Sequence, residues 1–171
     1  MERTTDNTPQ TAEVSGDFGS LACNPRLAEI FAAHRVVVAY LFGSQAEGTA
    51  GPLSDVDIAV LFDRAVPQDD HFDLHLSLIG ALTSLFHRDD VDVADLDRVS
   101  PLLKQRVRLR GRVLYCADEK QRIAFEVRAI GEYEDTRPLR ELRRRELFAH
   151  IRQGTFGYPV SPAEVTHVRP G

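Results

Sequence analysis

The sequence predicts an α/β (α+β) fold, in which helices pack on a small mixed β-sheet and a helical extension follows at the C-terminal end. Three observations support this fold class. Short apolar runs of strand length occur at residues 36–42, 55–61, 91–96 and 112–116. Stretches with helical spacing of apolar residues separate most of these runs. The chain of 171 residues is also the size of one domain with a proper core.

The two ends of the chain differ from its centre. Residues 1–22 are rich in Thr, Ser, Gly and acidic side chains, which predicts a disordered N-terminal tail. Residues 154–171 contain several prolines and glycines and are predicted to form a flexible C-terminal tail. The folded domain, including a C-terminal helix, is therefore expected over residues 23–153.

The first half of this domain carries clear helix and strand signals. Asn24 can cap a helix that has Pro25 at its first position, and the strand 36–42 follows it. A turn at residues 63–70 leads into a long helix. Its predicted apolar face consists of Phe72, Leu76, Leu78, Ile79, Leu82, Leu85 and Phe86. His71 and His75 lie four residues apart on this helix, but no third ligand is evident, so we interpret them as a solvated pair rather than a metal site.

The second half continues with two strands and three helical segments. A helix capped by Ser100 runs from Pro101 to Gly111, with Arg106 expected on its inward face beside Leu102, Leu103 and Val107. Arg106 either reaches a phosphate or lays its stem over the core. After the strand 112–116, Asp118 caps a helix whose predicted inner stripe is Ile123, Val127 and Ile130. Thr136-Arg137-Pro138 breaks or kinks this helix, and a second, Arg-rich arm continues to residue 151.

The composition argues against several classes of protein, including membrane-spanning and nucleic-acid-binding proteins. A hydrophobic content of 43% and a charged content of 27% are typical of a soluble globular protein. No run approaches the ~20 apolar residues of a membrane span, and no secretory signal is evident, so we expect a cytoplasmic protein without membrane contact. The net charge of −5 argues against direct nucleic-acid binding. Cys23 and Cys116 show no zinc-ligand spacing and are interpreted as two reduced thiols.

The strongest functional signal lies between residues 40 and 61. Gly43-Ser44 follows the first strand, and ten residues later Asp55-Val56-Asp57 opens the next. Because strand side chains alternate, Asp55 and Asp57 project from the same side, roughly 7 Å apart. Two carboxylates directed into one place are most simply explained by a cation between them, since like charges ~4 Å apart cost about 4 kcal/mol at an effective dielectric of ~20. Gly-Ser at a strand end suits a phosphate. The alternative is a turn with two exposed aspartates.

The motif Gly43-Ser44, ten residues, Asp55-x-Asp57 resembles the signature of the polymerase-β-like nucleotidyltransferases, specifically their minimal bacterial members. The resemblance covers about residues 35–117. It implies that Asp55 and Asp57, with Asp92 as a third carboxylate from the neighbouring strand, hold Mg²⁺, with a two-metal site expected. It also implies that Gly43 and Ser44 bind the phosphates of ATP, and that Asp92 can act as base for the acceptor hydroxyl. Taken alone, Asp92 could be only an exposed edge residue.

The Arg-rich C-terminal helix is similar to the extension of MntA-type antitoxins, which are paired with HEPN toxins. This resemblance implies a protein adenylyltransferase that moves AMP from ATP to a hydroxyl, expected to be a tyrosine, of a HEPN toxin and silences it. Three alternatives remain open: a small-molecule nucleotidyltransferase, an antitoxin that acts by binding alone, and a nucleotide sensor without turnover. The stretch Arg145 to His150 also matches the R-x4-H pattern of HEPN ribonucleases, but we do not interpret it as a nuclease centre, since such a site belongs to a helical bundle.

Overall fold

A computed structural model of the chain describes residues 24–51, 54–67 and 69–152. The elements follow in the order α1 (Pro25–Ala33), β1 (Val36–Phe42), α2 (Gly43–Glu47), β2 (Val56–Phe62), α3 (His71–Phe86), β3 (Val91–Asp95), α4 (Pro101–Arg110), β4 (Arg112–Cys116), α5 (Glu119–Asp135) and α6 (Arg137–Arg152). The predicted tails, residues 1–22 and 154–171, lie outside the described residues. The domain boundaries therefore stay predictions.

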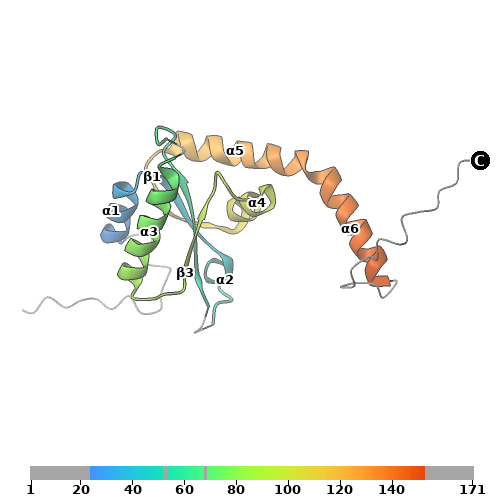
Figure 1. Cartoon of the computed structure of the whole chain (residues 1–171), viewed down its shortest axis with the longest axis horizontal. Helices are drawn as coiled ribbons and strands as arrows, with labels where there is room; N and C mark the ends of the chain where they lie inside the picture. Colours follow the sequence, from blue (N-terminus) through green and yellow to red (C-terminus); the bar gives the residue numbers. More distant parts are fainter. Residues whose placement is uncertain (1–23, 52–53, 68, 153–171) are drawn as a thin grey trace, which may run out of the picture.

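The four strands form one mixed sheet in the order β3-β2-β1-β4. β1 is antiparallel to both β2 and β4, whereas β2 and β3 are parallel. One face of the sheet packs on α1 and α3, and the other packs on α4 and α5 (Figure 1). The predicted fold class, a small mixed sheet with helices packed on it, is confirmed.

The central strand β1 explains why the sheet has two cores. All seven of its residues are buried. Alternate side chains enter opposite faces, so Leu41 joins the core under α1 and α3, while Tyr40 joins the core under α4 and α5. A strand that is apolar on both faces can occupy only an interior position, which places the end of β1 at the middle of the molecule.

The predicted helix starts are confirmed by their caps. The Asn24 side chain accepts hydrogen bonds from the N–H groups of Arg26 and Leu27. Ser100 accepts one from the N–H of Leu103 at 3.3 Å, and Asp118 accepts two at the start of α5. Each cap satisfies N–H groups that the first helical turn leaves without a partner.

Three predicted helix faces are partly wrong. Phe72 and Leu76 on α3 and Leu102 on α4 are exposed, although Leu78, Leu82 and Val107 are buried as predicted. The largest difference is on α5, where the predicted inner residues Ile123, Val127 and Ile130 are 51%, 65% and 43% exposed. The stripe of Phe125 and Ala129 is fully buried instead, because the Phe125 ring packs against Tyr40 of the sheet.

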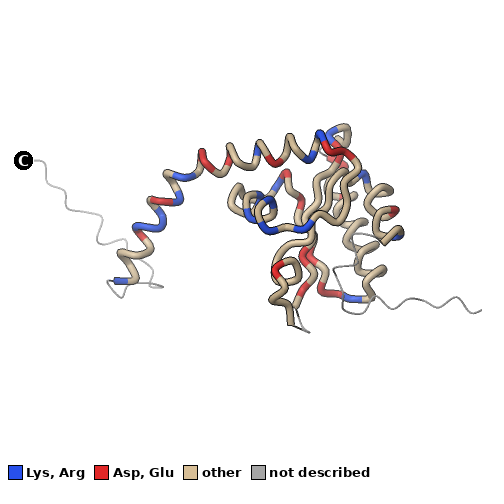
Figure 2. The backbone as a smooth tube through the Cα atoms, turned by 180° about the vertical axis from the view of Figure 1, so that it is seen from behind, with Lys and Arg blue, Asp and Glu red and all other residues tan. Residues whose placement is uncertain are grey.

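Helix α6 differs from the rest of the molecule. The break predicted at Thr136 is present: α5 ends there, and the Thr136 hydroxyl donates to the carbonyl groups of Glu132 and Tyr133. None of the side chains of α6 is buried, and the helix extends away from the sheet on the side of α4 (Figures 1 and 2). None of the described helices has the length and apolar content needed to cross a membrane.

Candidate active site

The three predicted carboxylates lie on adjacent strands at one end of the sheet. Asp57 is the second residue of β2 and half-buried, and Asp55 immediately precedes that strand and is exposed. Asp92 is the second residue of β3, also exposed, and pairs with Asp57 in the parallel register. Paired residues of neighbouring strands project to the same face about 5 Å apart. The structure therefore brings Asp57 and Asp92 side by side.

The electrostatics of Asp57 reflect this grouping. Burial raises the pKa of the Asp57 carboxyl, and the negative charges of Asp92 and Asp55 raise it further. Arg106 acts in the opposite direction and lowers the same pKa. An acidic group in this setting is more easily ionised when a cation approaches, because the cation offsets both the lost hydration and the repulsion.

Gly43 forms the wall of the site opposite Asp57. Its φ of +68° lies in the left-handed region, which favours glycine. A Cβ added to Gly43 would lie 2.0 Å from Oδ2 of Asp57, so only a residue without a side chain leaves room for this carboxylate. Ser44 follows in the first turn of α2, which no side chain caps. The predicted phosphate-binding pair thus lies directly against the predicted metal-binding pair.

Arg106 lies beside this site, but its predicted inward position is wrong. Its side chain is 54% exposed and pairs with Glu47 of α2 at 3.3 Å. Arg110 contacts the same carboxylate at 3.4 Å, and the hydrogen bond from Arg106 is the main reason that the pKa of Glu47 is lowered. Arg106 faces solvent because one turn of α4 buries Lys104 and Val107 instead.

The three predicted carboxylates offer only oxygen atoms as donors. Within the described ranges, no group of three or more His, Cys, Asp or Glu side chains is placed so that it could hold a metal ion by itself. The negative charges of Asp55 and Asp92 nevertheless both act on Asp57, and all three side chains offer oxygen donors. Mg²⁺ prefers oxygen, keeps several waters and binds through one or two carboxylates together with substrate phosphates, so an open carboxylate cluster suits it better than a cage.

The two histidines of α3 do not form the solvated pair that was predicted. His71 is buried, with Nδ1 3.4 Å from Oδ2 of the equally buried Asp95. His75 contacts the carbonyl oxygen of Val93 through Nε2 at 2.7 Å. Both rings therefore hold α3 against β3. Sequence spacing missed this because Asp95 is the last residue of β3, and nothing local in the sequence indicates that its carboxylate is buried.

Sequence reasoning also missed Lys104. This lysine is buried on α4 and donates to Oε2 of Glu132 on α5 at 2.7 Å. The available signal was its spacing of three residues from Val107, which places both on one helix face. The pair lies in a cavity lined by Asp63, Asp97 and Arg128, among others. Asp63 follows the end of β2, so this cavity is at the opposite end of the sheet from Asp57.

Comparison with known proteins agrees with this geometry. Residues 26–120 match the family model described as "Polymerase beta, Nucleotidyltransferase". The chain belongs to the polymerase β nucleotidyltransferase family. This nucleotidyltransferase is 36% identical over 95 residues to the protein adenylyltransferase MntA of Shewanella oneidensis, a match that covers 56% of the present chain and 64% of the relative. It thus spans slightly less than two thirds of the length of that relative.

Several solved structures with the same fold are toxin–antitoxin complexes. One was crystallised with AMP-PNP; the nucleotidyltransferase matches a chain of it with a TM-score of 0.61 and 26% identity, over 72% of its own length and 96% of the other chain. Another is a tri-AMPylated Shewanella oneidensis HEPN toxin in complex with MNT antitoxin, with a TM-score of 0.51, 25% identity and coverage of 70% and 91%.

Proposed function

We propose that this nucleotidyltransferase is an antitoxin that transfers AMP from ATP to a tyrosine hydroxyl of a HEPN-family toxin and thereby silences the toxin. The observation that carries the proposal is the side-by-side placement of Asp57 and Asp92 against the bare backbone of Gly43. Similarity to MntA and to the toxin–antitoxin complexes supports the choice of donor and acceptor.

Each residue of the site has a role in this reaction. Asp55 and Asp57 would hold Mg²⁺, shared with Asp92, and bound Mg²⁺ would offset the charge on the transferring and leaving phosphates. Gly43 and Ser44 would bind the terminal phosphates of ATP. Arg106 supplies positive charge on the same side of the site, since it already acts on Asp57.

The chemistry is a single displacement at the α-phosphorus of ATP. The acceptor oxygen forms a bond to this phosphorus while the bond to the bridging oxygen breaks, and pyrophosphate leaves. Asp92, the more exposed partner of the Asp57–Asp92 pair, accepts the proton of the acceptor hydroxyl as general base. No residue of the chain becomes covalently attached to the nucleotide.

The deciding experiment separates transfer from binding. The double variant Asp55→Asn with Asp57→Asn keeps side-chain size and should leave the outer surface intact. We expect the wild type, with ATP and Mg²⁺, to add the mass of one or more adenylyl groups to its cognate HEPN-family toxin. The double variant should still bind that protein but lose several powers of ten in transfer rate, where each factor of ten is ~1.4 kcal/mol of barrier. Full protection of cells by the double variant, with no mass added by the wild type, would instead establish a binding-only antitoxin.

A further inference from the structure

Helix α6 has a surface that is not buried against the other described elements. It has 16 residues and no buried side chain. Isolated helices of this length are marginal in water, and most helices in proteins are stabilised by packing of an apolar face. The apolar side chains that α6 exposes are Leu139, Leu142, Leu147, Phe148 and Ile151. Leu147, Phe148 and Ile151 lie on one side of the helix, and exposed apolar side chains grouped in this way are typical of a protein-binding surface.

The charge of α6 indicates the chemistry of what binds there. The helix carries six arginines and two glutamates, whereas the chain as a whole has a net charge of −5. Blue segments recur along α6 in Figure 2. A basic arm of this kind is complementary in charge to an acidic partner.

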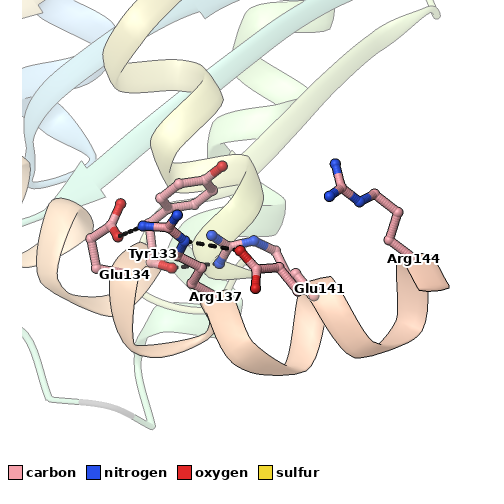
Figure 3. A pocket seen from close by; sticks show the side chains of 6 residues that line it. Tyr133, Glu134, Arg137, Glu141 and Arg144 are labelled. Atoms are coloured by element: carbon pink, nitrogen blue, oxygen red, sulfur yellow. Dashed lines mark hydrogen bonds and ion pairs between the residues drawn. The ribbon is translucent and has the colours of Figure 1, made fainter.

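The junction of α5 and α6 contains a cavity of about 420 Å³, lined by Tyr133, Glu134, Arg137, Arg140, Glu141 and Arg144 (Figure 3). Two of its arginines are already engaged. Arg137 pairs with Glu141 at 3.1 Å and with Glu134 at 3.7 Å. The Arg140 guanidinium lies 3.6 Å from the centre of the Tyr133 ring and donates to the Tyr133 carbonyl and the Thr136 hydroxyl.

Arg144 is the arginine of this cavity with donors to spare. Among the residues that the structure describes, its guanidinium makes no hydrogen bond, although its positive charge helps to lower the pKa of Glu141. Figure 3 shows its side chain extending from α6. It lies four residues after Arg140 and four before Phe148, so the three share one face of the helix. A free guanidinium is a planar fork that binds a carboxylate or phosphate through two parallel hydrogen bonds.

The other residues of the cavity favour a carboxylate over a phosphate chain. Glu134 and Glu141 line the same space, and their charges oppose a polyanion such as RNA more strongly than a single carboxylate. Phe148 and Ile151 are exposed next along the same face, and apolar contact of this kind suits a protein partner. A mixed surface of arginines, glutamates and apolar side chains is typical of a protein interface.

The position of α6 relative to the candidate active site indicates which protein partner binds to it. In Figure 1, α4 lies between the sheet and α6, and α2 lies on the same side of the sheet. Arg106 and Arg110 of α4 contact Glu47 of α2, the helix that begins at Gly43. A protein seated on the inner side of α6 therefore lies on the side of the molecule where Gly43 and Asp57 are found.

We propose that the α5–α6 junction is the docking surface for the protein acceptor of AMP, with Arg144 binding a carboxylate of an acidic segment of that protein. This rests on the proposed function, because it takes the acceptor to be a protein. It adds a recognition site separate from the catalytic carboxylates.

The test compares two adjacent arginines. Arg144→Glu and Arg143→Glu make the same charge change on neighbouring, exposed residues of α6, but only Arg144 lines the cavity. Binding of the full chain to the HEPN-family protein is measured by isothermal titration without ATP, so that no transfer occurs. We expect Arg144→Glu to weaken binding at least tenfold and Arg143→Glu by less than threefold. Equal effects of the two variants, or no effect of Arg144→Glu, would overturn the proposal.

Two further measurements separate this proposal from the proposed function. A single-stranded RNA of random sequence is titrated in parallel, and loss of RNA binding without loss of protein binding in Arg144→Glu would also overturn it. The mass of the HEPN-family protein after incubation with ATP and Mg²⁺ reports transfer. Binding that depends on Arg144 without any added mass would refute the adenylyltransferase function and leave the docking surface standing. Transfer that proceeds equally well in Arg144→Glu and Arg143→Glu would support the adenylyltransferase function and refute the docking surface.

Discussion

The backbone of Gly43 and the carboxylate of Asp57 exclude any side chain between them, since a Cβ on Gly43 would lie 2.0 Å from Oδ2 of Asp57. Phe42, the residue before Gly43, pairs with Asp57 in the antiparallel register of β1 and β2. The end of one strand therefore fixes the position of a carboxylate on the next.

Substitution of Gly43 should consequently damage the site more than the fold. We expect Gly43→Ala to cost about 1 kcal/mol of stability from its positive φ and to abolish transfer, because the methyl group displaces Asp57. Gly48→Ala is a matched control: its φ is +71° and nothing lies within 4 Å of the added Cβ. It should lose similar stability but retain transfer. Thermal unfolding and AMP incorporation, measured on both variants, check this; comparable activity in the two would contradict the arrangement.

Removing the charge of Asp57 should stabilise the protein in the absence of ligands. The raised pKa of Asp57 means that the folded protein holds this proton up to a higher pH than the unfolded chain does. Stability therefore falls as pH rises through the window between the unfolded and folded pKa, and the loss persists at neutral pH. Asp57→Asn should recover up to about 1 kcal/mol, since the site is partly solvated.

The same variant should lose the stabilisation that ATP with Mg²⁺ gives to the wild type by mass action. Asp89→Asn, at an exposed position, serves as the control and should change neither value. Melting curves between pH 4 and 8, with and without ATP and Mg²⁺, provide the measurement. A ligand-dependent shift that survives in Asp57→Asn would be incompatible with its assignment as a metal ligand.

Arg106 and Arg110 allow a second matched comparison. Both contact Glu47, but only Arg106 also acts on the charge of Asp57. If Arg106 contributes to phosphate binding, Arg106→Ala should raise the KM for ATP about tenfold, which corresponds to ~1.4 kcal/mol, whereas Arg110→Ala should leave it nearly unchanged. Steady-state kinetics at saturating acceptor concentration distinguish them. A similar rise in both would assign the effect to the loss of contacts with Glu47.

Which face of α5 packs on the sheet can be tested by truncating one residue on each face of the helix. Phe125 is fully buried, so Phe125→Ala should destabilise the protein by about 3–5 kcal/mol. Ile123, two residues earlier, is half-exposed, and Ile123→Ala should change stability by about 0.5 kcal/mol or less. Urea unfolding curves report both values, and a larger loss in Ile123→Ala would restore the face that periodicity predicted.

The elements and most of the candidate site could be predicted from sequence because their signals are local. Caps such as Asn24 and Asp118 act within one helical turn, and the alternation that puts Asp55 and Asp57 on one side belongs to a single strand. Gly43-Ser44 and Asp55 are separated by only ten residues, so their relationship is also close in sequence. Asp92 required a resemblance to a known family, because strand order is set by packing over the whole domain.

What sequence could not provide is the direction that each helix faces. On α5 both stripes are apolar, and the smaller one, Phe125 with Ala129, is buried because Tyr40 lies beneath it. The burial of Lys104 depends on Glu132, 28 residues away. The cavity around Arg144 depends on the angle at Thr136 between α5 and α6. The first two are long-range relationships, and periodicity encodes none of the three.

The complete burial of β1 has a consequence for motion. Gly43 follows directly from the strand that is enclosed on both faces, whereas α6 buries nothing. Amide hydrogens in β1 should therefore exchange with solvent only when the whole domain unfolds, and those in α6 should exchange through local opening that costs little free energy. Among the described elements, the candidate site therefore adjoins a strand that we expect to exchange slowly, and the proposed partner surface lies on a helix that we expect to exchange fast. We expect a bound acceptor to be detected first as protection of the α6 amides.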